Sequence, residues 1–111
     1  MSGTGTLSTH VLDTGRGTPA TGIPVRLLRG SEAIGAAETD RDGRVRDFGR
    51  VADQLAPGSY ALVFDVGAYF ARDQRATFYR EITVAFEIVD GGHFHVPLLL
   101  SPFGYSTYRG S

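Results

Sequence analysis

Three segments alternate apolar and polar residues with a period of two, and this pattern limits the chain to a β fold more than any other feature. The segments are residues 59–66, 81–90 and 91–102. In the third, Phe94, Val96, Leu98 and Leu100 fall on one side of an extended chain. Because successive side chains of a strand point to opposite faces, each segment predicts a strand with one buried face.

Weaker patterns predict further strands, and Gly- and Pro-rich turns separate all of them. These weaker strands are expected at residues 6–13, 23–30 and 33–39, with one short helix at residues 68–75. Many short strands in a chain of 111 residues are typical of an all-β sandwich. We expect a single domain over residues 1–111, with residues 1–5 flexible.

The composition excludes several classes of function. The chain has no cysteine, so disulfides and thiolate chemistry are absent. Its net charge is -1 and no basic tract occurs, so we expect no nucleic-acid partner. All 11 basic residues are arginines, which suit bidentate recognition of flat anions. We find neither a secretory signal nor an apolar run of membrane-spanning length, and expect a cytoplasmic protein with no membrane partner.

The three histidines are His10, His93 and His95. His93 and His95 are two residues apart on a predicted strand, so their rings point the same way. With His10 they would match the three-histidine ligand set of a catalytic zinc site, although no carboxylate is placed to orient them. The alternative is that these histidines lie on an ordinary surface or interface.

Pro97 and Leu99 share the predicted outer face with His93 and His95. Scattered apolar residues are normal on protein surfaces. The alternative is that a second subunit covers this face and leaves a pocket over the histidines.

A metal-free site would use the same residues differently. A neutral imidazole can take a proton from water, and an arginine can stabilise the developing oxyanion. Arg44 is the candidate arginine because it follows Asp42-Gly43, a dipeptide typical of tight turns. The alternative is a solvated turn arginine, with Asp40 and Asp42 acting only as turn formers.

Several segments resemble the 5-hydroxyisourate hydrolases, the transthyretin-like enzymes of urate breakdown. The similar segments are LSTHVLDTGRGTPATGIPVRL from Leu7, ETDRDGRV from Glu38, GSYALVFDVGAYF from Gly58 and HFHVPLLLSPFGYSTYRGS from His93. Together they cover nearly the whole chain from Leu7 to Ser111. The final Tyr108-Arg109-Gly110-Ser111 is the most specific of these matches, since it distinguishes the hydrolases from the hormone carrier transthyretin.

The resemblance implies a transthyretin-like β-sandwich of two four-stranded antiparallel sheets with one short helix, assembled as a homotetramer of two dimers. It implies hydrolysis of 5-hydroxyisourate to 2-oxo-4-hydroxy-4-carboxy-5-ureidoimidazoline without a metal or other cofactor. By position, the implied catalytic residues are His10, Arg44 and His95. The implied substrate-binding residues are His10, Arg44, Tyr108, Arg109, Gly110 and Ser111. His93 lies outside the matched catalytic set.

Three alternatives remain at this point. A transthyretin-like carrier would bind a small molecule in the same channel without catalysis. A structural adhesion-type sandwich would be monomeric. A zinc hydrolase would need metal. The sequence does not decide whether His10 or His95 is the general base.

Overall fold

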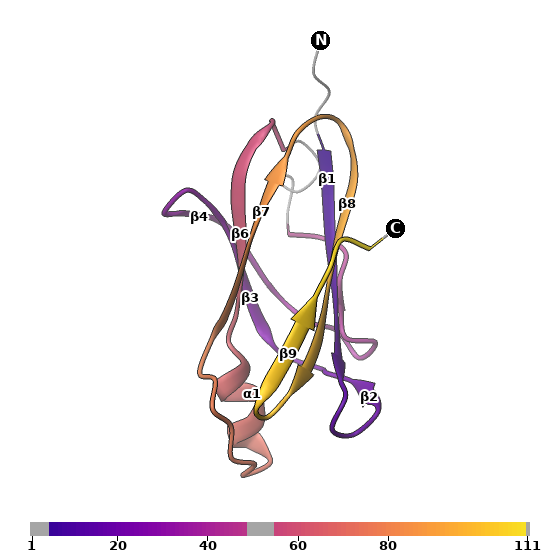
Figure 1. Cartoon of the computed structure of the whole chain (residues 1–111), viewed down its shortest axis with the longest axis vertical. Coiled ribbons are helices and arrows are strands. Elements are labelled where there is room, and N and C mark those ends of the chain that lie inside the picture. The colour runs from indigo at the N-terminus through magenta and orange to yellow at the C-terminus, as the bar shows by residue number, and fades with distance from the viewer. Residues whose placement is uncertain (1–4, 49–54, 111) are drawn as a thin grey trace.

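The computed structural model describes residues 5–48 and 55–110. Its strands and helix follow the chain in this order: β1 (Gly5–Asp13), β2 (Thr18–Pro19), β3 (Pro24–Arg29), β4 (Glu32–Glu38), β5 (Arg44–Val45), β6 (Gly58–Phe64), α1 (Val66–Arg72), β7 (Ile82–Ile88), β8 (Gly92–Ser101) and β9 (Gly104–Thr107). Two sheets face each other along the length of the molecule, and α1 lies at one end (Figure 1). The predicted all-β sandwich with one short helix is confirmed.

One sheet has the strand order β4-β3-β6-β7, and the other has the order β2-β1-β8-β9 with β5 also paired to β1. Two details therefore differ from the expectation of two four-stranded antiparallel sheets. The second sheet gains a short fifth strand, because the turn before Arg44 folds Arg44 and Val45 back against β1. In addition, β1 and β8 are parallel over nine residue pairs, from Gly5↔Gly92 to Asp13↔Leu100.

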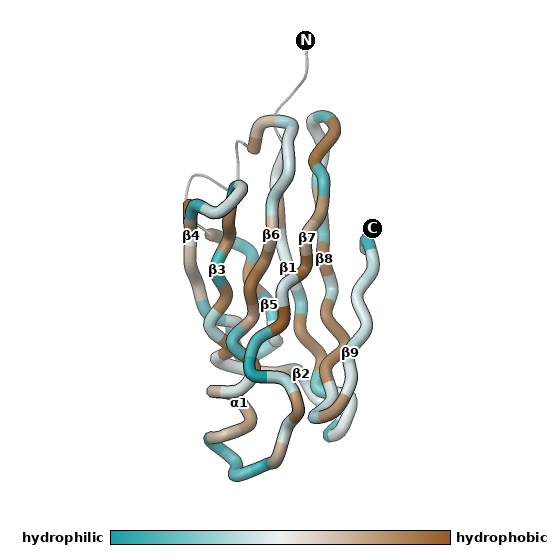
Figure 2. The backbone as a smooth tube through the Cα atoms, turned by 60° about the vertical axis from the view of Figure 1, so that its left-hand side comes forward, coloured by the Kyte–Doolittle hydropathy of each residue, from teal (hydrophilic) through white to brown (hydrophobic). Residues whose placement is uncertain are grey.

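The core lies between the sheets, and the period-two pattern supplies it. Phe94, Val96, Leu98 and Leu100 are all buried, as the alternation predicts. On β6 the tube is coloured as strongly apolar, with more polar residues toward the strand ends and turns (Figure 2). Burial of a side chain such as Leu98 stabilises the fold by about 1.5–3 kcal/mol relative to exposure.

Two elements, α1 and β1, begin earlier in the chain than the sequence pattern indicates. The helix starts at Val66 instead of residue 68, because the Asp65 side chain accepts a hydrogen bond from the Ala68 N–H at 3.2 Å and caps the first turn. Gly5, expected to be flexible, is buried and exchanges backbone hydrogen bonds with Leu55 at 2.8 and 3.0 Å. Residues 1–4 lie outside the described part of the chain.

A buried ion pair ties the end of β1 to the segment after α1. The Asp13 carboxylate is fully buried; it accepts hydrogen bonds from the Arg75 guanidinium at 2.6 Å and the Tyr69 hydroxyl at 2.7 Å. Burial opposes ionisation of Asp13, but these hydrogen bonds and the one from the Arg16 N–H outweigh it. The pKa of Asp13 is therefore lowered.

Candidate active site

Parallel pairing of β1 with β8 gathers the histidines on one outer face of the sheet. The register sets Thr6 opposite His93, Ser8 opposite His95 and His10 opposite Pro97. Side chains two residues apart on one strand share a face, so these polar residues form a patch.

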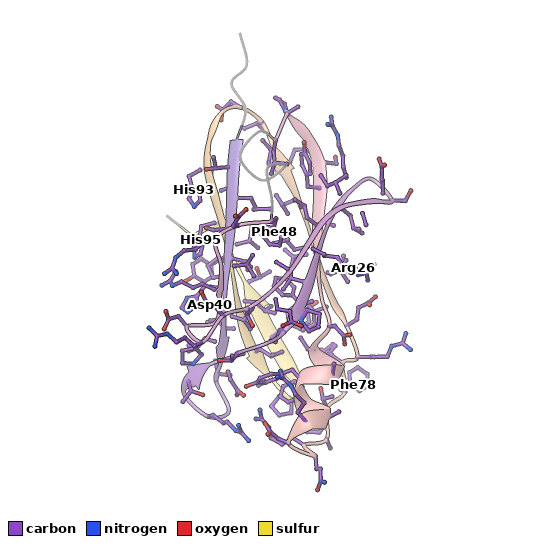
Figure 3. All side chains as sticks on the ribbon, turned by 180° about the vertical axis from the view of Figure 1, so that it is seen from behind. Arg26, Asp40, Phe48, Phe78, His93 and His95 are labelled. Atoms are coloured by element: carbon purple, nitrogen blue, oxygen red, sulfur yellow. The ribbon has the colours of Figure 1, made fainter. Side chains whose placement is uncertain are left out.

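His93 and His95 project on the same side of the molecule as Asp40, and Arg26 lies on the other side (Figure 3).

Arg44 reaches this patch through a tight turn. The Asp40 carboxylate accepts hydrogen bonds from the backbone N–H groups of Asp42 at 2.8 Å and Arg44 at 3.0 Å. The hydrogen bond from Arg44 in particular lowers the pKa of Asp40. Gly43 has a φ of 75°, and a Cβ there would collide with the carbonyl oxygen of Val11, so the turn requires glycine.

The turn delivers Arg44 directly opposite His10 in the antiparallel β1–β5 pair. Directly opposite residues have Cβ atoms about 4.5–5.5 Å apart. Among the described residues, no carboxylate lies within ion-pair distance of the Arg44 guanidinium, whereas Arg46 pairs with Asp40 at 3.6 Å. Arg44 thus keeps its donors available beside an imidazole.

A cavity of about 350 Å³ opens over this patch. Its lining residues are Ser8, Thr9, Arg44, Arg46, His93 and His95. His10 does not line the cavity but adjoins it through its pairing with Arg44. The structure therefore places Arg44 and His95 on one solvent-accessible space, with His10 next to Arg44 at its edge.

His95 is the ring that this environment changes most clearly. Burial lowers its pKa below the ordinary imidazole value, and repulsion from Arg44, and from His10 and His93 whenever these are protonated, lowers it further. At neutral pH the ring is consequently neutral. Its Nδ1 lies 2.8 Å from Ser8 Oγ, while Nε2 has no hydrogen-bond partner within residues 5–48 and 55–110. A neutral imidazole with one unengaged nitrogen can act as a base.

A second, larger cavity of about 410 Å³ also touches His95. It lies beside β7 and the C-terminal segment, and most of its lining is apolar, including Val84, Phe86 and Phe94. Neither His10 nor Arg44 lines it. We place the candidate active site in the smaller cavity because that space holds the convergent polar groups.

The C-terminal segment packs onto the same part of β8. Gly110 donates its backbone N–H to the carbonyl oxygen of His95 at 2.8 Å. A Cβ at Gly110 would come within 2.6 Å of His95 Cδ2 and 3.1 Å of Pro97 Cγ. Pro97, expected on the outer face, is buried. The same chain's C-terminal segment packs against it, so its burial requires no second subunit.

Tyr108 and Arg109, two other predicted substrate-binding residues, do not line the smaller cavity. Tyr108 is 58% exposed and lines the larger cavity. The Arg109 guanidinium lies 4.4 Å from the ring centroid of Phe94, a core-facing residue on the opposite face of β8 from His95. The structure therefore does not bring Arg109 into the His10–Arg44–His95 cluster. Ser111 lies outside the described residues.

Three further residues belong to the site and were not singled out from the sequence as site residues. Ser8 and Thr6 contact the histidines, and Arg46 lines the cavity. Ser8 and Thr6 share the face of His10 because they are two and four residues away on the same strand. This spacing could be recognised in the sequence. The parallel register that sets Ser8 and Thr6 against His93 and His95 could not.

The zinc alternative lacks the required geometry. Within residues 5–48 and 55–110, no three His, Asp or Glu side chains converge as a metal-ligand set. Both ring nitrogens of His93 instead face hydroxyls, Thr6 Oγ1 at 2.6 Å from Nδ1 and Ser8 Oγ at 2.9 Å from Nε2.

Comparison with known proteins places this arrangement in a family. The chain is 43% identical to a 5-hydroxyisourate hydrolase of Salmonella typhi over 115 residues, covering 99% of this chain and 84% of the relative. The structure of Klebsiella pneumoniae 5-hydroxyisourate hydrolase superposes with a TM-score of 0.90 at 42% identity, covering 96% of this chain and 99% of the other. Transthyretin from Sparus aurata superposes with a TM-score of 0.85 at 28% identity, covering 94% and 95%.

The match to a family model extends over residues 7–110, which includes both histidine-bearing strands and the Arg44 turn. The chain belongs to the HIUase/Transthyretin family.

Proposed function

We propose that this protein is a 5-hydroxyisourate hydrolase, which opens the six-membered ring of its substrate by attack of water at a cyclic amide. The product is 2-oxo-4-hydroxy-4-carboxy-5-ureidoimidazoline. The similar proteins from Salmonella typhi and Klebsiella pneumoniae are named 5-hydroxyisourate hydrolases. The observation that carries the proposal is that Arg44 and His95 line one cavity, with His10 paired to Arg44 beside it.

His95 serves as the general base in the proposed reaction. Its neutral ring accepts a proton from water at Nε2, and the resulting hydroxide attacks the ring carbonyl carbon. The C–N bond then breaks, and the proton is delivered to the leaving nitrogen. Positioned acid–base groups of this kind contribute roughly 10²–10⁴-fold to the rate.

Arg44 stabilises the negative charge that develops on the carbonyl oxygen. A planar guanidinium provides paired donors for a carbonyl or anionic edge of a flat substrate. Loss of one oxyanion donor costs about 3–4 kcal/mol of transition-state stabilisation. His10, the cross-strand neighbour of Arg44, hydrogen-bonds the substrate or the attacking water next to the guanidinium.

The terminal tetrapeptide completes the proposed site. Tyr108 packs against the part of the substrate ring that extends past His95 into the larger cavity, and Gly110 sets the distance between the C-terminal segment and His95. Ser111 contributes a donor to the bound substrate, whereas Arg109 packs on Phe94, away from the His10–Arg44–His95 cluster. No metal or cofactor takes part in the proposed reaction.

We further propose a homotetramer built as a dimer of dimers. Four aromatic residues support an interface, since Phe78, Phe103, Tyr105 and Tyr108 are 76%, 70%, 42% and 58% exposed. The strands β7 and β9 each end a sheet, and unpaired sheet edges favour association.

The proposed compartment is the cytoplasm. In the described part of the chain, no helix is long and apolar enough to cross a membrane. The chain also lacks the cysteines that small secreted domains use for disulfides.

The test is to mix the protein with freshly oxidised urate and follow the ultraviolet decay of 5-hydroxyisourate. The wild type should accelerate the decay, and His10→Ala, Arg44→Ala and His95→Ala should each lower turnover at least a hundredfold. Arg41→Ala is the matched control, because Arg41 is exposed on the same turn as Arg44. A protein that binds the compound without accelerating its decay would instead be a carrier.

A further inference from the structure

Four side chains form a continuous hydrogen-bonded row beside the cavity. Thr6 Oγ1 lies 2.6 Å from His93 Nδ1. Ser8 Oγ lies 2.9 Å from His93 Nε2 and 2.8 Å from His95 Nδ1. One hydroxyl thus bridges the two imidazoles, whose rings are nearly parallel at an interplanar angle of 17°.

The single hydrogen of the Ser8 hydroxyl links the positions of the hydrogens on the two rings. A serine hydroxyl has one hydrogen, so Ser8 donates to one imidazole and accepts from the other. When His95 Nδ1–H donates to Ser8, the Ser8 hydrogen goes to His93 Nε2, and His93 Nδ1–H donates to Thr6. When the hydrogen bonds run in the opposite direction, Thr6 donates to His93 Nδ1, His93 Nε2–H donates to Ser8 Oγ, and Ser8 donates to His95 Nδ1. His95 then carries its hydrogen at Nε2.

The two directions correspond to two states of the base. In the first, His95 Nε2 has a free lone pair and can take a proton from water. In the second, His95 Nε2–H can give a proton to a leaving group. Ser8 therefore connects the tautomer of His95 to the protonation of His93.

The surroundings favour placing a positive charge on His93 over His95. His95 is half-buried, whereas His93 is exposed to solvent. The charged and titratable groups around the pair are His10 on β1, Arg44 on β5, Arg46 directly after β5, and Glu87, Tyr108 and Arg109 beside the larger cavity. The one carboxylate among these groups, Glu87, is exposed and accepts a hydrogen bond from the Ser59 hydroxyl at 2.8 Å. It therefore does not pair with His95, and a proton is better held on the solvated ring.

We propose that Ser8 and His93 are positioning residues that form a proton relay behind His95. As the water O–H bond breaks and His95 Nε2–H forms, the Nδ1 hydrogen passes to Ser8 Oγ and the Ser8 hydrogen passes to His93 Nε2. His93 becomes the imidazolium and His95 stays neutral. When the C–N bond breaks, each hydrogen moves back, and His95 Nε2 gives its proton to the leaving nitrogen. This relay rests on the proposed hydrolase function.

A readout that does not need activity comes from NMR of protein labelled with ¹⁵N at histidine. In the wild type, His95 should hold its hydrogen at Nδ1, and His93 and His95 should titrate as a coupled pair. Ser8→Ala removes the bridge, so His95 should lose the preference for Nδ1–H and the two titrations should separate. Ser8→Thr keeps a hydroxyl and should restore the wild-type pattern. Unchanged tautomers and titrations in Ser8→Ala would overturn the relay.

Kinetics supply the second readout. Ser8→Ala and His93→Gln should lower kcat about 10- to 100-fold with KM nearly unchanged, because the groups that bind substrate remain. The pH dependence of kcat should also shift in both variants, and Ser8→Thr should recover most of the rate. Ser59→Ala is the matched control, since Ser59 is a strand serine on the other sheet that bonds Glu87 at 2.8 Å.

The outcomes separate the two proposals. A wild type that fails to turn over freshly oxidised urate would refute the hydrolase function, and the NMR comparison would still decide whether Ser8 couples the rings. An active wild type whose Ser8→Ala and His93→Gln variants keep its kcat and pH profile would refute the relay and leave the hydrolase function standing.

Discussion

Gly110 donates its backbone N–H to the carbonyl oxygen of His95, and its Cα rests against the imidazole of that residue. The hydrogen bond fixes the C-terminal segment, and the missing side chain lets it approach the ring. The orientation of His95 thus depends on Ser8 at one ring edge and on Gly110 at the other.

Gly110→Ala should therefore impair the site. The added methyl would lie 2.6 Å from His95 Cδ2, so either the ring or the C-terminal segment must move. Misplacement of a reacting group by about 1 Å costs roughly 10²-fold in rate, and we expect a loss of that order in steady-state assays. Gly104→Ala is the control, because a Cβ there makes an ordinary 3.6 Å contact with Ser101 Oγ. Equal losses in both variants would contradict the prediction.

The pH profile should report the lowered pKa of His95. Catalysis needs the neutral ring, so kcat should fall as the pH drops through a value below the ordinary imidazole pKa of about 6.5. Turnover measured across the acid range in a constant-ionic-strength buffer tests this. A midpoint above 6.5 would show that a different group controls the rate.

Arg44→Gln should raise the pKa of His95. Removing a nearby positive charge makes the protonated imidazole less unfavourable, so the acid midpoint in an NMR titration should move toward higher pH. High salt should move the wild-type midpoint in the same direction by screening Arg44. Arg26→Gln, on the other side of the molecule, should leave the midpoint in place.

Asp40 and Asp42 should differ in their effect on catalysis, although both occupy one turn. The Asp40 carboxylate holds the Arg44 N–H at 3.0 Å, so Asp40→Ala should loosen Arg44 and lower turnover about tenfold or more. Asp42 contributes only its backbone N–H to that carboxylate, and Asp42→Ala should retain activity. Comparable kcat/KM values for the two variants would show that the turn does not position Arg44.

Tyr69→Phe should destabilise the fold and spare the site. It removes the hydroxyl that donates to the buried Asp13 carboxylate at 2.7 Å, at a cost of about 1.5–3 kcal/mol in the free energy of unfolding. Urea denaturation with a parallel activity assay checks both halves of the prediction.

The lowered pKa of Asp13 determines how the free energy of unfolding changes as the pH falls. Its contribution to stability is complete above the unfolded-state pKa near 3.9 and is lost as the pH falls through the lower folded-state pKa. The stability difference between Tyr69→Phe and wild type should therefore shrink in strong acid. A constant difference down to that range would contradict this assignment.

The sequence predicted the fold where side-chain alternation was strong and failed where pairing depended on distant segments. Phe94, Val96, Leu98 and Leu100 identified the buried face of β8 correctly. The two-residue strand Arg44–Val45 has no alternation to detect, and only its pairing with β1 makes it a strand. The parallel alignment of β1 with β8 leaves no local trace in either segment.

The site was predictable to a similar extent. A period of two sufficed to place His93 and His95 on one face, and the Asp-Gly dipeptide indicated the turn before Arg44. The bridging position of Ser8 required the register between two strands, and the burial of Pro97 required the path of the C-terminal segment. These features depend on tertiary packing and not on any one stretch of sequence.

The parallel alignment of β1 with β8 also sets when the protein can become active during its synthesis. Ser8 and His95 are 87 positions apart, so the two halves of the cluster meet only after β8 has left the ribosome. Contacts of such long sequence separation form slowly, because most of the chain must order before they close. A nascent chain that has completed β1 to β7 is therefore expected to be catalytically silent, which ties the onset of activity to the synthesis of β8.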